Sequence, residues 1–96
     1  MKIGILQVEL FISDAASLKD KRRVVNSLKD KIHREHLVAV AEVDALDKHQ
    51  RAILGIAAVS NDARHLQGML DRMIDGLKRD TRFVLSDYAT ELISGS

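Results

Sequence analysis

A cluster of four cationic side chains is the strongest chemical feature of this sequence. It consists of Lys19, Lys21, Arg22 and Arg23. The apolar periodicity that follows places the cluster in the first turns of a helix. Cations at a helix N-terminus oppose the helix dipole by about 0.3–1 kcal/mol each before screening. A sequence that breaks a local rule in this way often marks a site. Cations beside the free N–H groups of a helix start suit a phosphate, so we expect a phosphate-binding site here.

A helical projection separates these cations. At about 100° per residue, Lys21 falls near the apolar stripe, so it must extend to the surface or pair with a carboxylate. Residues 17–35 hold seven Lys/Arg against three Asp/Glu, a local charge of +4 in a chain of net charge +1. A solvated helix face with acidic partners is the alternative interpretation. The predicted phosphate-binding set is Lys19, Lys21, Arg22, Arg23, Asn26, Lys29 and Arg51.

Other groups of reactive residues are weaker candidates. His33 and His36 are three positions apart, which is half of a metal site at best. Glu42, Asp44 and Asp47 have oxygens suited to Mg²⁺, which leaves a metal-dependent small-molecule enzyme as a further alternative. The absence of cysteine excludes disulfides and thiolate chemistry. No catalytic residue, metal ligand or cofactor is assigned, and we expect a protein that is not an enzyme.

Composition limits the kind of nucleic-acid binding that is expected. Aromatic residues make up only 3% of the chain, and none lies in the predicted strand at residues 50–60. A sheet that stacks RNA bases needs aromatic side chains on its central strands. Contact with a ribosome or another RNA is therefore expected to involve phosphates and to weaken strongly with salt. Sequence-specific DNA recognition is not expected.

Six elements must position these residues. Apolar and alternating runs predict strands at residues 2–12, 37–44, 50–60 and 82–93. Apolar stripes predict helices that begin at Ser17, where Asp20 completes the spacing of a capping box, and after residues 60–62. The order β-α-β-β-α-β predicts one α+β domain over residues 1–96 of the ferredoxin-like split βαβ type. Both helices should cover one face of a four-stranded antiparallel sheet, whose first and third strands are central. Residues 94–96 are expected to be a frayed tail.

The predicted third strand is apolar on both faces, whereas two helices can cover only one. An exposed apolar face of this kind usually marks an interface, and two-fold homodimers are the commonest oligomers. The alternative is that short loops cover this face. Gly4 and Gly55 lie in the two central strands, where we expect them to admit closely packed helices. The residues predicted to form a homodimer interface are Ile3, Ile5, Phe11, Ile53 and Val59.

No segment predicts a membrane or a secretory route. No stretch approaches the ~20 apolar residues of a membrane span. The first apolar run leads into a charged helix and not into a small-residue cleavage site. We therefore expect a cytoplasmic protein without a membrane partner.

Five segments together resemble a known family: residues 18–25, 27–30, 40–44, 50–55 and 59–62. They are similar to the YlxP-like family of small bacterial proteins of unknown function, and the resemblance runs from Met1 to about Ile93. It implies a ferredoxin-like fold. It also implies a link to translation, because members are commonly encoded beside initiation-factor and ribosome-binding-factor genes. The family has no established activity.

The segment from Asp44 to His49 departs from the family pattern, in which Asp-His-Gln-Asp and an aromatic residue precede Gln-Arg. No catalytic or stacking role is therefore expected of this connector, whereas the basic segment 19–23 is intact. The predicted function is a non-enzymatic ribosome- or RNA-associated module. The alternative is a dimeric protein-binding adaptor that uses the apolar sheet face or an edge strand, with binding that is insensitive to salt.

Overall fold

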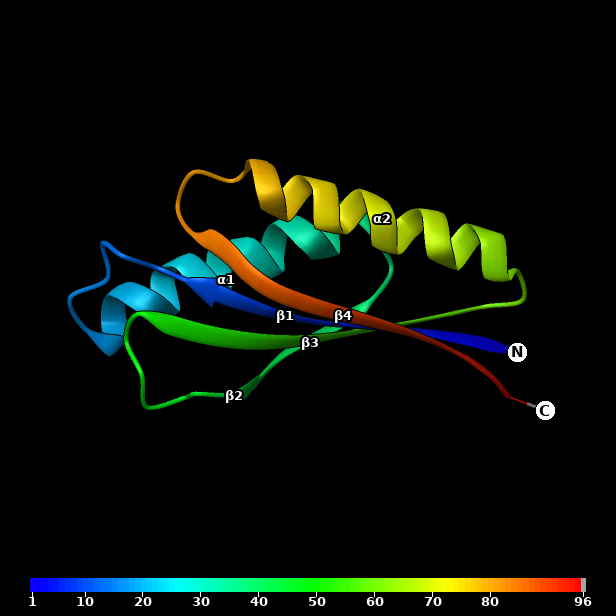
Figure 1. Cartoon of the computed structure of the whole chain (residues 1–96), viewed down its shortest axis with the longest axis horizontal. Coiled ribbons are helices and arrows are strands. Elements are labelled where there is room, and N and C mark those ends of the chain that lie inside the picture. Colours follow the sequence, from blue (N-terminus) through cyan, green and yellow to red (C-terminus); the bar gives the residue numbers. More distant parts are fainter. Residues whose placement is uncertain (96) are drawn as a thin grey trace.

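The structure is a computed structural model that describes residues 1–95. Its elements are β1 (Lys2–Phe11), α1 (Leu18–Glu35), β2 (Ala39–Asp44), β3 (Arg51–Ser60), α2 (Ala63–Arg79) and β4 (Val84–Ser94). The strands form one antiparallel sheet in the order β2-β3-β1-β4. Both helices lie on the same face of this sheet (Figure 1). The predicted ferredoxin-like fold, with β1 and β3 central, is confirmed.

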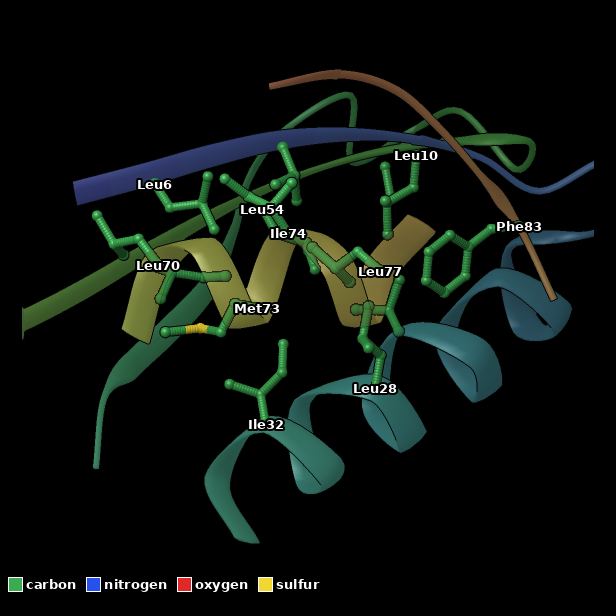
Figure 2. Close-up of a cluster of buried hydrophobic side chains, with 14 of the residues drawn as sticks. Leu6, Leu10, Leu28, Ile32, Leu54, Leu70, Met73, Ile74, Leu77 and Phe83 are labelled. Atoms are coloured by element: carbon green, nitrogen blue, oxygen red, sulfur yellow. The ribbon is translucent and has the colours of Figure 1, made fainter. Parts of the chain in front are cut away.

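The core lies between the sheet and the two helices. Even-numbered residues of β1 and β3 point toward the helices, and Leu6, Leu10 and Leu54 are completely buried. Figure 2 shows side chains of α1 and α2 directed at these leucines. Each such burial stabilises the fold by about 1.5–3 kcal/mol. Within residues 1–95, no helix is long and apolar enough to cross a membrane.

Half of the capping box predicted at the start of α1 is confirmed, because Asp20 bonds the N–H of Ala16 and not that of the N-cap Ser17. Ser17 Oγ accepts a hydrogen bond from the backbone N–H of Asp20 at 3.1 Å. The carboxylate of Asp20 accepts one from the backbone N–H of Ala16 at 2.9 Å. A negative side chain therefore already occupies the positive end of the helix dipole. Backbone N–H groups at the start of α1 are therefore already hydrogen-bonded in part by side chains of the protein itself.

The predicted frayed tail is wrong for two of its residues. Ser94 ends β4 opposite Lys2, whose Nζ donates a hydrogen bond to Ser94 Oγ at 2.9 Å. The N–H of Gly95 donates to the carbonyl of Met1 at 2.8 Å. The two ends of the described chain therefore lie side by side (Figure 1). Ser96 lies outside the described residues.

The two strand glycines have different neighbours. A Cβ at Gly4 would lie 3.5 Å from side-chain carbons of Leu66 and Leu70 on α2, so the expected helix contact is confirmed. For Gly55 this expectation is wrong. A Cβ there would lie 3.1 Å from a methyl group of Val43 on β2. Gly55 therefore makes room for a neighbouring strand's side chain.

Candidate functional site

Helix α1 packs over β2 and β3 and turns a basic face to solvent. Lys19, Arg22, Arg23 and Asn26 are all exposed, and we call these four residues the α1 outer face. Lys29 is half-buried at its border. Within residues 1–95, no cation of the α1 outer face forms an ion pair with a carboxylate. The projection from the sequence thus placed these four side chains correctly.

Lys21 is separated from the other cations of the cluster. Its side chain is 1% exposed, and its Nζ lies 2.7 Å from the carboxylate of Glu42. Of the two alternatives that the helical projection left for Lys21, the structure shows the pairing with a carboxylate. The same Nζ also donates to the backbone carbonyls of Ala45 at 2.9 Å and of Leu46 and Arg51 at 3.3 Å. An ammonium group has three N–H donors, so these contacts leave none for an external phosphate. Lys21 does not fit the phosphate-binding role predicted for it.

The connector between β2 and β3 is shaped around this ammonium group. Ala45 has a φ of 57°, a left-handed conformation that costs a residue with a Cβ about 1 kcal/mol. Asp44 Oδ1 accepts the N–H of Ala45 at 2.7 Å, and the carbonyl of Ala45 accepts the N–H of Lys48 at 3.0 Å. The resulting turn points backbone carbonyls at Lys21. Lys21 therefore docks α1 onto the β2–β3 hairpin.

Arg51 also does not join the α1 outer face. It begins β3 on the sheet face that points away from the helices, which we call the open face. There its Nε donates to the carboxylate of Glu9 on β1. The pair borders a cavity of about 740 Å³, which is also lined by Phe11, Ser86 and the connector residues 47–50. The side chain of Arg51 thus lies on the opposite face of the sheet from α1, although its backbone carbonyl accepts a hydrogen bond from Lys21.

The residues considered for a metal site do not converge. Glu42 is bound to Lys21, and Asp44 bonds the backbone of its own turn. His36 Nε2 lies 4.0 Å from the carboxylate of the neighbouring Glu35. Within residues 1–95, no group of three or more His, Cys, Asp or Glu side chains is arranged to hold a metal ion.

The five residues of the predicted dimer interface all lie on the open face and are spread along the length of β1 and β3. Ile3 and Val59 are paired at one end of the sheet, whereas Phe11 lies at the other end of β1, ~27 Å away. Polar side chains of β1 lie between these two ends. Val59 is 64% exposed and Phe11 44%, but Ile53 is only 7% exposed. Ile53 therefore offers almost no surface to a partner.

Comparison with known proteins shows the family. Residues 3–90 match a family of proteins of unknown function, DUF503. The chain belongs to the DUF503 family. It is also 35% identical over 72 residues to the uncharacterised protein YlxP of Bacillus subtilis strain 168. That alignment covers 75% of this chain and 78% of the relative, and it confirms the YlxP-like resemblance.

One polar cluster of this DUF503 protein escaped the sequence reasoning. Arg82 bonds the carboxylate of Asp80 at 2.7 Å and the hydroxyl of Ser27 on α1 at 2.8 Å. The hydrogen bond from Arg82 lowers the pKa of Asp80 from its usual value. The signal available in the sequence was the acidic Asp80 two positions before the basic Arg82. The hydrogen bond to Ser27 could not be predicted from this spacing, because Ser27 and Arg82 are 55 positions apart. This cluster fastens the α2–β4 connection to α1.

The α1 outer face of this DUF503 protein is an exposed surface rich in hydrogen-bond donors. It offers two guanidinium groups, one ammonium group and one amide on a single rigid helix. These groups donate hydrogen bonds to anions, and the guanidinium geometry matches a phosphate. The arrangement suits the binding of a phosphate group.

Proposed function

We propose that this DUF503 protein is a non-enzymatic module that binds RNA phosphates, on the ribosome, through the α1 outer face. One observation carries the proposal. Lys19, Arg22 and Arg23 are exposed on one helix face and pair with no carboxylate within residues 1–95, whereas Lys21 and Arg51 are paired. A phosphate that meets these three cations does not have to break an internal ion pair.

The chemistry of this face favours the RNA backbone over the bases. The chain has two Phe and one Tyr, and none lies on α1. Base stacking needs such rings, whereas Arg and Lys bind phosphates of any sequence. Asn26 follows Arg22 and Arg23 by about one turn and adds amide donors. The half-buried Lys29 extends the basic surface toward the middle of α1.

Side chains carry this binding in our proposal, and backbone N–H groups do not. Asp20 and Ser17 already take up donors at the start of α1. The phosphate therefore lies along the outer face and not at the helix tip. A ribosomal partner also places the protein in the cytoplasm.

The test compares two double charge reversals. Arg22→Glu with Arg23→Glu changes the α1 outer face, and Lys48→Glu with Arg64→Glu reverses two exposed cations elsewhere. Both variants have the same net charge. Binding to single-stranded RNA is measured by fluorescence anisotropy, and binding to ribosomes by co-sedimentation, each at low and high salt. We expect the first variant to bind at least about tenfold more weakly at low salt, and the control to stay within about threefold of wild type.

The salt dependence provides a second readout. Three cations on single-stranded RNA predict a slope of about −2 for log affinity against log salt concentration, and the outer-face variant should flatten it. Equal losses in the two variants, or a wild-type protein without RNA binding or without a salt slope, would contradict the proposal. Capture of a protein partner that ignores both salt and the helix variants would instead support the adaptor role.

A further inference from the structure

Strand β4 has the features of a strand that pairs with another chain. It forms one edge of the sheet, and within residues 1–95 no strand pairs with its outer side. It is 11 residues long, ten of them exposed, and its sequence contains no Lys, Arg or Pro. Edge strands that remain single are usually short or protected by charged side chains, by Pro or by bulges. The protection of β4 is limited to two acidic side chains and one bulge near its start. The opposite edge strand, β2, has only six residues.

The helix side of β4 also carries exposed apolar groups. Tyr88 and Leu92 lie opposite Val8 and Gly4 of β1, on the side of the core, yet they are 43% and 42% exposed. A groove of about 390 Å³ runs there between α2 and β4, with Tyr88 and Thr90 among its lining residues. Charged side chains of α2 also line this groove, so the exposed apolar surface on this side of β4 is confined to Tyr88 and Leu92. A further strand beside β4 would continue the sheet beneath it.

We propose that β4 pairs antiparallel with β4 of a second copy of this chain, around a two-fold axis at Thr90. The two four-stranded sheets then become one continuous sheet. A two-fold axis that relates adjacent antiparallel strands is perpendicular to the sheet, so both copies keep their helices on the same side. Residues at equal distances on either side of the axis then lie opposite each other.

A bulge limits the length of β4 that can take part. Asp87 pairs with Glu9 of β1, and Leu85 pairs with Leu10, so Ser86 is an extra residue. Because of this extra residue, the alternation of side chains between the two sheet faces is interrupted at the bulge. The regular part of β4 is therefore residues 87–94.

Charge then selects the position of the axis. An axis at Ala89 sets Asp87 against Glu91 of the second copy, and an axis at Glu91 sets that residue against itself. Like charges directly opposite destabilise a strand pair. An axis at residue 88 or 92 leaves only 87–89 or 90–94 to pair. An axis at Thr90 pairs residues 87–93 without opposing like charges.

The Thr90 register also matches the exposed apolar groups. It sets Tyr88 opposite Leu92 of the second copy, and this contact occurs twice because of the symmetry. Both side chains lie on the helix side and are exposed there, and Tyr88 lines the groove. Aromatic and aliphatic side chains that face each other across strands stabilise the pair. Two threonines meet at the axis and can exchange a hydrogen bond.

A single introduced cysteine tests this register, because the chain has no cysteine of its own. In Thr90→Cys, the two Cα atoms across the axis are about 4.5–5.5 Å apart, within the range of a disulfide. We expect a covalent dimer under mild oxidation. In Tyr88→Cys, the two copies are ~14 Å apart, so none should form. Leu37→Cys, at a site 93% exposed, controls for random collision.

Sedimentation or light scattering provides an independent measurement. Wild type should reach twice the mass of one chain as its concentration rises, and Thr90→Lys should remain a monomer with an unchanged circular dichroism spectrum. Ala39→Lys places the same charge on β2 at the other edge and should still dimerise. A monomeric wild type with equal cross-linking at residues 90 and 37 overturns the proposal. A dimer that survives Thr90→Lys, or that Ala39→Lys abolishes, also overturns it.

Discussion

Lys21 and Arg22 are adjacent cations in opposite environments. One residue on a helix turns the side chain by about 100°, which directs Lys21 into the protein and Arg22 into solvent. Lys21 is held by Glu42 and by backbone carbonyls of the β2–β3 region, and Arg22 forms no ion pair within residues 1–95. The positive charge of Lys21 thus holds the fold together, whereas that of Arg22 is exposed and available for binding.

Lys21→Met should destabilise the protein by about 3–5 kcal/mol, because it leaves the carboxylate of Glu42 and several carbonyls without their donor. The measurement is the free energy of unfolding in urea. Arg22→Met is the matched control, and its effect should lie within about 0.5 kcal/mol of zero because its side chain is exposed. If the two variants are equally stable, Lys21 does not dock α1 on the hairpin.

At the scale of elements, the close pairing of β2 with β3 depends on the absence of a side chain at Gly55. Val43 of β2 covers Gly55 of β3 on the open face, and a Cβ at Gly55 would lie 3.1 Å from it. Such a distance is shorter than ordinary van der Waals contact, so the strand pair would have to adjust. At Gly4 a Cβ would meet the side chains of α2 at an ordinary 3.5 Å.

We expect Gly55→Ala to cost about 1 kcal/mol of stability through overpacking. Gly4→Ala, its control, should be neutral or stabilise by up to about 1 kcal/mol, because alanine restricts the unfolded chain. Val43→Ala removes the obstructing methyl groups, so combined with Gly55→Ala it should show a coupling of at least about 0.5 kcal/mol. Urea unfolding of wild type, Gly55→Ala, Val43→Ala and the double variant measures this coupling, and Gly4→Ala is measured in the same way. Additive effects would mean that Val43 is not the obstacle.

At the scale of the whole molecule, the two proposals together define one RNA-binding assembly. Helix α1 lies over β2 and β3, away from the β4 edge. With strands ~4.8 Å apart, a β4–β4 dimer would set the two α1 helices roughly 30 Å apart on the same side of the sheet. One RNA long enough to span this distance would contact both.

Thr90→Lys should therefore weaken binding to a long RNA while leaving binding to a short one unchanged. The reason is avidity, which two linked sites gain without any new contact, and the expected loss is at least about tenfold. Fluorescence anisotropy with the two RNA lengths measures it, with Ala39→Lys as the control. Equal losses on both lengths would show that Thr90→Lys damages the binding face itself.

The sequence by itself determined the six elements, their order and the fold. Strands and helices bury side chains with periods of 2 and 3.6 residues, and these periods are visible without any tertiary contact. The same periodicity set Lys19, Arg22 and Arg23 outward, and it placed Lys21 near the apolar stripe, where it had either to extend to the surface or to pair with a carboxylate. Helix capping at Ser17 was equally readable, because its bonds span only a few residues.

Only the tertiary structure decided which remote groups meet. It paired Lys21 with Glu42 and set the side chain of Arg51 on the opposite face of the sheet from α1. It also placed Phe11 and Val59, two residues of the predicted interface, at opposite ends of the same sheet face. These outcomes depend on strand register and on bulges, which are set by contacts between segments far apart in the chain. A local pattern predicts on which side of its helix or strand a residue lies. The packing of distant segments decides which groups that residue contacts.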